Sequence, residues 1–182
     1  MLATMLKSKP SLFARGAGNG KLGGGRKMNP GKRFEQKFMD SFEPHAYVLR
    51  IPDNVYMCGN RLMGNESEAD FLVVTGTDAY LIECKATCGE SLQFRSVKEH
   101  QEVSLVEFDD IGERSHGFLA VEFYDKEGYH KPHRMFLLPI GEWMRYKADS
   151  GRKSMPIKAF EEMGVELAYK KGAYAFEGRW FR

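Results

Sequence analysis

The stretch DFLVVTGTDAYLIECK, residues 70–85, determines how the rest of the chain is interpreted. Its two apolar runs flank Gly76-Thr77-Asp78, residues that favour a turn, so the stretch predicts an antiparallel hairpin. With the turn centred between the first two of these residues, Asp70 lies directly opposite Glu83, and directly opposed side chains share one face of a sheet. Because side chains alternate along a strand, Lys85 lies on that face as well.

This arrangement predicts a metal site. Two opposed carboxylates repel one another, and folding alone does not require such a pair at the end of an apolar strand. Mg²⁺ prefers oxygen ligands and lowers the pKa of bound water, while Lys85 could orient that water or neutralise charge on a phosphate. The alternative is an exposed ion pair of Glu83 and Lys85 at a sheet edge, with Asp70 only beginning a strand.

The first 33 residues contain eight basic and no acidic side chains, and the rest of the chain carries 19 positive and 25 negative charges, a net of −6. Residues 16–25 are glycine-rich and have too few apolar side chains to repay the entropy of ordering. We therefore expect a flexible basic arm over residues 1–28 and a single domain over residues 29–182. The basic side chains expected to contact nucleic-acid phosphates are Arg15, Lys21, Arg26, Lys27, Lys32 and Arg33.

A nucleotide cofactor is not expected. Gly20-Lys21 resembles the end of a phosphate-binding P-loop, but Arg15 occupies the position of the first glycine and Leu22 that of the Ser or Thr. His130 and His133 are predicted to be loop residues, because Pro132 prevents helical spacing and no third ligand is adjacent.

Composition narrows the class of protein further. A length of 182 residues with 42% hydrophobic side chains indicates one globular domain. No apolar run approaches the roughly 20 residues that span a bilayer, and no signal-peptide pattern is present, so we expect a cytoplasmic protein without a membrane partner. Three cysteines do not supply the two ligand pairs of a structural zinc site, and they are predicted to be reduced thiols.

The remaining elements are read from apolar periodicity. A helix is expected to begin at Asn29-Pro30, to bury Phe34, Phe38 and Phe42, and to end at Pro44. Glu35 lies beside that apolar stripe, so its carboxylate could face inward. A second helix is expected after a capping box at residues 96–99, with Gln101 as the polar exception on its apolar face.

Strands are expected over residues 47–51, 117–124 and 135–138, in addition to the hairpin. The predicted order is therefore αβββαββ, followed by a C-terminal extension with helices around residues 143–146 and 157–163 and an irregular end. The connection over residues 52–69 has weak periodicity and is interpreted as a short stalk.

These motifs together resemble a known family. Glu35, Asp70, the Glu83-Cys84-Lys85 triplet and Gln101 occur in the order found in the PD-(D/E)XK nuclease core, and the chain is similar to RecU-type Holliday junction resolvases. Residues 137–139 and 152–156 also look similar to later segments of that family. The connection over residues 52–68 departs from the resemblance, because it is shorter than the stalk of the family.

The resemblance implies a restriction-endonuclease-like α/β (α+β) fold with a mixed central sheet flanked by helices. It implies that Asp70 and Glu83 bind Mg²⁺, or alternatively Mn²⁺, with the Cys84 carbonyl as a third ligand. Lys85 would position the attacking water, and Glu35 and Gln101 would support metal, water or substrate. The implied activity is that of a homodimer that nicks four-way DNA junctions symmetrically in recombination and repair.

Two rival functions remain open from the sequence. One is a related nuclease that acts on flap or other branched DNA. The other is a DNA-binding module that keeps the fold but does not cleave, although the intact set of Asp70, Glu83 and Lys85 argues against it.

Overall fold

The computed structural model describes residues 29–42, 46–58, 61–65, 67–125, 133–170 and 173–176. The predicted arm over residues 1–28 lies outside these ranges, as do Pro44 and His130. Four of the six predicted phosphate-binding residues are in that arm: Arg15, Lys21, Arg26 and Lys27.

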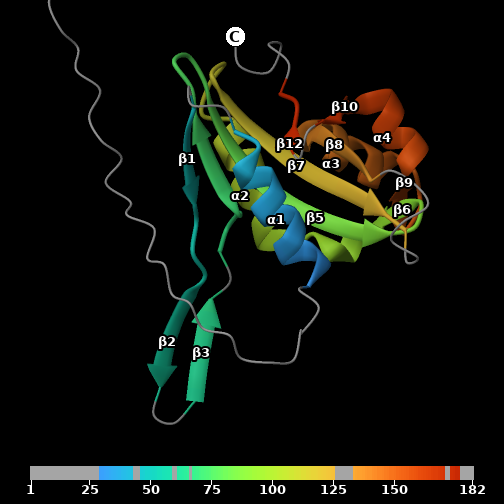
Figure 1. The fold of residues 1–182 in the computed structure, drawn as a ribbon. Coiled ribbons are helices and arrows are strands. Elements are labelled where there is room, and N and C mark those ends of the chain that lie inside the picture. The colour runs from blue at the N-terminus through green and yellow to red at the C-terminus, as the bar shows by residue number, and fades with distance from the viewer. Residues whose placement is uncertain are drawn as a thin grey trace, which may run out of the picture.

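A mixed six-stranded sheet forms the centre of the protein, in the order β1-β4-β5-β7-β8-β10 (Figure 1). Only the β5–β7 pairing is parallel, and every other pairing in this sheet is antiparallel. The strands are β1 (Tyr47–Arg50), β4 (Phe71–Val74), β5 (Ala79–Cys88), β7 (Ser115–Tyr124), β8 (Arg134–Pro139) and β10 (Val165–Leu167).

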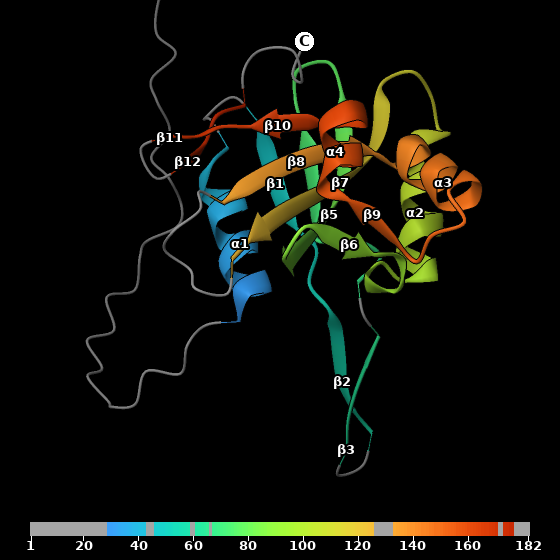
Figure 2. The same cartoon turned by 90° about the vertical axis from the view of Figure 1, so that its right-hand side faces the viewer.

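Helices cover both faces of this sheet (Figure 2). The helix α1 packs on one face, whereas α2, α3 and α4 contribute to the apolar cluster on the other face. Their bounds are α1 (Pro30–Asp40), α2 (Glu99–Asp109), α3 (Ile140–Asp149) and α4 (Ile157–Met163). Within the part of the chain that the structure describes, no helix is both long and apolar enough to cross a membrane.

The predicted order of the main elements is confirmed. The sheet and its helices follow the chain as α1, β1, β4, β5, α2, β7 and β8, which is the αβββαββ order. The connection before β4 adds an antiparallel hairpin, β2 (Asn54–Cys58) and β3 (Arg61–Asn65), which projects away from the sheet as a stem (Figures 1 and 2). The Ile51 amide donates to the Asp70 carbonyl oxygen at 2.8 Å, so the chain leaves and re-enters the domain at the same point.

The register predicted for the central hairpin is also confirmed. Phe71 pairs with Ile82 and Val74 with Ala79, and the Asp70 amide donates to the Ile82 carbonyl oxygen at 3.1 Å. Directly beyond these pairs, Asp70 therefore stands opposite Glu83, at the point where the stem joins the sheet.

The first helix begins as predicted but ends earlier. The Asn29 side chain accepts from the Gly31 amide at 3.0 Å, and Phe34 and Phe38 are fully buried. The helix stops at Asp40, where Ser41 forms the C-cap. Its end is set by that cap and not by the later proline.

The predicted capping box of the second helix is wrong. Phe94–Ser96 form a 3-10 turn, η1, and Val97 is extended, so α2 begins two residues later with Lys98 as its N-cap. The side-chain oxygen of Gln101 accepts from the Lys98 amide at 3.1 Å. Gln101, which was interpreted as the polar exception on the apolar face of this helix, is thus also part of the helix cap.

The C-terminal extension contains both predicted helices, and its described part also contains short strands that were not predicted. The strand β10 joins the main sheet beside β8. The short strands β11 (Tyr169–Lys170) and β12 (Ala173–Tyr174) pair with each other, and β6 (Ser91–Gln93) pairs with β9 (Ser154–Pro156). Strands of two or three residues are too short to produce a recognisable alternation in the sequence.

Candidate active site

Glu83 is a buried carboxylate in the middle of the sheet. It lies on β5 between two neighbouring strands and is 2% exposed. Its Oε1 accepts from Lys85 Nζ at 2.5 Å and from Gln101 Nε2 at 2.8 Å. The exposed edge ion pair considered as the alternative is therefore wrong, because the pair exists but is buried on a central strand.

Gln101 joins the strand to the helix above it. Its side-chain oxygen accepts from Lys85 Nζ at 3.1 Å and from the Lys98 amide, while its nitrogen donates to Glu83. The amide is 7% exposed and has partners on both its oxygen and its nitrogen. The Lys85 ammonium is thus held between a carboxylate and an amide in one fixed position.

Asp70 approaches the same group from the adjacent strand. Its Oδ2 accepts from the Cys84 backbone amide at 2.7 Å, a bond that fixes the carboxylate beside residues 83–85. Cys84 itself points into the apolar cluster under α1, on the opposite face from Glu83.

The electrostatic surroundings disfavour two negative charges here. Burial, opposed by the Cys84 amide and reinforced by the charge of Glu35, raises the pKa of Asp70 to about 6. Burial and the charge of Asp70, opposed by Lys85, raise the pKa of Glu83 to about 7. The site therefore lacks positive charge near neutral pH even though Lys85 is present.

A third carboxylate, Glu35, faces the site from α1. It is close enough to raise the pKa of both other carboxylates, and it pairs with Arg50 at 2.5 Å. The sequence reasoning missed Arg50. It is the last residue of β1, directly before the stem, and only the β1–β4 pairing shows that this strand end meets Asp70.

A small cavity beside this pair contains one of the predicted phosphate contacts. Its volume is about 230 Å³, and its lining includes Lys32, Glu35, Arg50 and Phe71. Lys32 is exposed and next to the site, as its predicted role requires. Arg33 is half-buried, with a buried Nε that has no partner among the described residues.

The residues present fit a divalent cation. Glu83 Oε2 is buried without a hydrogen-bond partner in the described structure, although buried carboxylate oxygens are normally satisfied. No three His, Cys, Asp or Glu side chains among the described residues form a complete metal cage. A cation here would use the Asp70 and Glu83 carboxylates together with backbone oxygen and water, which is the ligand set that Mg²⁺ accepts.

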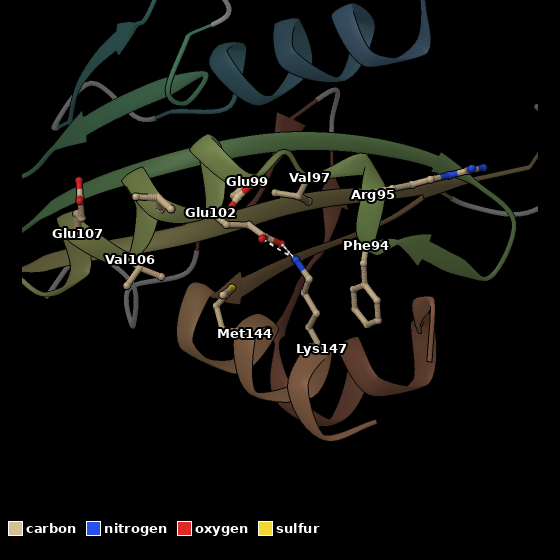
Figure 3. Close-up of a pocket in the computed structure, with 10 residues that line it drawn as sticks. Phe94, Arg95, Val97, Glu99, Glu102, Val106, Glu107, Met144 and Lys147 are labelled. Carbon is tan, nitrogen blue, oxygen red and sulfur yellow. Dashed lines mark hydrogen bonds and ion pairs between the residues drawn. The ribbon is translucent and has the colours of Figure 1, made fainter. Parts of the chain in front are cut away.

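A second cavity lies elsewhere and was not anticipated. It is a groove of about 560 Å³ whose lining includes Val103 and Met144. Figure 3 shows Lys147 reaching from α3 across this groove to Glu102 on α2. Because Glu102 accepts from Lys147 at 2.6 Å and from the Trp143 indole at 2.7 Å, its charge is already compensated and it leaves no open ligand position.

Another buried carboxylate, Glu122, lies on the α1 face of β7. Its Oε1 accepts from Lys37 at 3.0 Å and from the Tyr174 hydroxyl at 2.8 Å, and it lies 3.0 Å from His133 Nδ1. Burial raises the pKa of Glu122, but these hydrogen bonds outweigh it and hold the pKa below its usual value. His133 therefore has a structural partner here.

The cysteine prediction agrees with the described thiols. Cys84 and Cys88 are both free, one buried and one exposed. The side chain of Cys58 lies outside the described residues.

Comparison with known proteins gives a likeness in structure and none in sequence. No family model and no curated protein matches the chain. Among solved structures, the chain is similar to one from Archaeoglobus fulgidus, described as Hjc, a Holliday junction resolvase from an archaeal hyperthermophile. The two are 16% identical, with a TM-score of 0.48, over 77% of this chain and 93% of that one. The functional proposal therefore rests on the side chains of the candidate site.

Proposed function

We propose that the protein is a metal-dependent endonuclease that hydrolyses phosphodiester bonds in DNA. The observation that supports this most directly is the buried Glu83 carboxylate beside Asp70. One of its oxygens is bound to Lys85 and Gln101, and the other has no partner within the part of the chain that the structure describes. A cation between the two carboxylates would remove their repulsion and satisfy the free oxygen.

Mg²⁺ is the proposed cofactor, with Mn²⁺ as the alternative, held by Asp70, Glu83 and the Cys84 carbonyl. When bound, the cation would polarise a phosphoryl oxygen and acidify water. The protein supplies the positioning. Gln101 and Glu83 hold the Lys85 ammonium in place, where it can orient a water molecule and stabilise negative charge developing on the phosphate.

The substrate that we propose is a four-way DNA junction, cut by paired symmetric nicks during recombination and repair. Two identical nicks require two sites, which a homodimer of RecU type would supply. The proposal draws on the resemblance of the sequence motifs, and on Lys32 and Arg50 beside the candidate site, where they can neutralise phosphate.

One assay tests this function. The full chain is incubated with Mg²⁺ and end-labelled four-way junction, flap and linear duplex DNA. The variant Asp70→Ala is tested beside it, with the control Glu113→Ala, which removes an exposed carboxylate two residues before β7. We expect symmetric junction nicks from the full chain and the control, and at least a ~100-fold loss in Asp70→Ala, because a metal ligand is removed.

The other outcomes separate the rivals. Preferential cleavage of the flap would assign a different branched substrate to the same site. Binding without cleavage under Mg²⁺ or Mn²⁺ would leave a DNA-binding module, and normal cleavage by Asp70→Ala would show that the site is wrongly placed.

A further inference from the structure

Three exposed cations gather where two short strands meet. Arg95 is in η1, and Arg152 and Lys153 directly precede β9. The Phe94 amide donates to the Lys153 carbonyl oxygen at 3.1 Å, which holds the two segments side by side. None of the three cations forms an ion pair with another described residue. Their charges are therefore available to an external partner.

The backbone around these cations is well defined. The pairing of β6 with β9 continues up to Gln93 and Ser154, so both segments are anchored by strands. Gly151 has a φ of +62°, in the left-handed region that favours glycine, and this turn ends α3 and directs the chain back into β9. The cations thus lie on a fixed part of the surface.

A short segment leads from this surface to the candidate active site. η1 leads through Val97, which is 3% exposed, directly into the first turn of α2, where Gln101 contacts Glu83 and Lys85. Arg95 is also one of the residues that line the groove between α2 and α3. Figure 3 shows its side chain extending away from Glu102 and Lys147, which bridge that groove.

The opposite side of the site also carries positive charge. Lys32 and Arg50 lie at the α1 side, beside Glu35. Figure 2 shows the first turn of α1, the base of the stem and the segment leading into α2 along the same lower side of the domain. The candidate site therefore lies between two basic surfaces.

We infer that Arg95, Arg152 and Lys153 bind DNA backbone phosphates on one side of the cleaved bond, while the α1 side binds those on the other. This inference rests on the proposed function and deepens it. Duplex DNA carries one charge per ~1.7 Å of its length, and guanidinium groups bind phosphate with two parallel hydrogen bonds. Phosphates held on both sides of the site require DNA to continue past the cut in both directions, so the cut is internal.

The test is the salt dependence of DNA binding. The full chain and the triple variant Arg95→Gln, Arg152→Gln, Lys153→Gln are titrated with labelled junction DNA in Ca²⁺, at several salt concentrations. Each lost phosphate contact reduces the magnitude of the slope of log affinity against log salt by about 0.9. We therefore expect the slope of the triple variant to be smaller in magnitude than that of the full chain by about 2 to 3. The control Arg114→Gln, Arg145→Gln, Lys158→Gln, with the same change of charge, is expected to keep the slope of the full chain.

A second pair of variants separates charge from structure. Arg95→Lys with Arg152→Lys keeps the charges, so the slope is expected to stay close to that of the full chain, whereas a structural role for the arginines would not be rescued. If the full chain cleaves junction DNA and the triple variant keeps the same slope, the inference is wrong and the proposed function stands. If the full chain neither binds nor cleaves DNA, both are wrong.

Discussion

At the scale of single residues, Glu83 carries a charge that its surroundings oppose. Burial and Asp70 raise its pKa, while Lys85 and the Gln101 amide bind only one of its two oxygens. A buried oxygen without a hydrogen-bond partner among the described residues costs about 1–3 kcal/mol. The arrangement is explained if a cation completes it.

The raised pKa values predict how stability depends on pH without metal. Between about pH 4 and pH 7, Asp70 and Glu83 still bind protons in the folded protein, whereas the unfolded chain has already released them. The free energy of unfolding should therefore fall as pH rises through this range. The expected loss for the two carboxylates together is on the order of 5 kcal/mol. It is measured by urea unfolding in EDTA across this range.

Magnesium and a double variant provide the controls for this measurement. Mg²⁺ added at pH 7.5 should restore the lost stability, because it binds the ionised carboxylates of the folded state. Asp70→Asn with Glu83→Gln should unfold with little dependence on either pH or Mg²⁺ in this range. A chain stabilised equally by Mg²⁺ with and without these carboxylates would place the cation elsewhere.

At the scale of elements, the position of α2 depends on how closely it approaches β7. A Cβ at Gly117 on β7 would overlap the Leu105 carbonyl oxygen of α2 and lie 3.0 Å from the Ile140 side chain. The absence of a side chain there brings the helix against the sheet, and the first turn of the same helix carries Gln101. Close packing at one end of the helix therefore helps to position an amide in the site at the other end.

The variant Gly117→Ala should move this helix. We expect a loss of about 1–3 kcal/mol in the free energy of unfolding, since overpacking displaces backbone and not only a flexible side chain. Cleavage should fall as well, because Gln101 and Lys85 lose their alignment. The control Gly141→Ala adds a Cβ in α3 with no atom within 4 Å, and it should be neutral or slightly stabilising. Equal stability of the two variants would show that α2 can shift without cost.

At the scale of the whole molecule, Glu122 connects four separate parts of the chain. Lys37 from α1, Tyr174 from β12 and His133 before β8 all meet its Oε1. Tyr174 is also packed against Phe34, with ring centroids 6.0 Å apart. The C-terminal strand thus holds in place the helix that carries Glu35.

Removing one hydroxyl tests this connection. Tyr174→Phe should cost about 1–3 kcal/mol near neutral pH, because a buried carboxylate loses one donor. The lowered pKa of Glu122 means that its stabilisation is present at neutral pH and is lost as the carboxyl is protonated in acid. The difference from the full chain should therefore narrow below about pH 4, as measured by urea unfolding. The control Tyr169→Phe removes an exposed hydroxyl and should change little.

The sequence alone predicted the parts of this fold that depend on strong, local patterns. The hairpin register followed from its turn residues and two apolar runs, and it placed Asp70 opposite Glu83. The four-residue spacing of Phe34 and Phe38 predicted which face of α1 is buried. The convergence of Glu35 and Gln101 on the site was expected from a family resemblance and not from the hairpin.

What could not be predicted depends on contacts between distant segments. Arg50 is one basic residue among many, and only the pairing of β1 with β4 brings it to Glu35. The cap of α2 was misplaced because tertiary contacts of Gln101 decide where the helix begins. Strand β10 is three residues long and is defined by its neighbour β8, not by its own sequence pattern.

The base of the stem is closed by a hydrogen bond, so the β2–β3 stem can vary without changing the candidate site beside it. Because the Ile51 amide is bonded to the Asp70 carbonyl oxygen, everything between them forms a loop whose ends are already joined by the domain. Doubling the length of such a loop costs only about 0.6 kcal/mol of closure entropy. Insertions and deletions at this point can therefore accumulate during evolution without altering the register of the β4–β5 hairpin. In an engineered protein, the same position would accept a hairpin of another length while the arrangement of Asp70 and Glu83 stays intact.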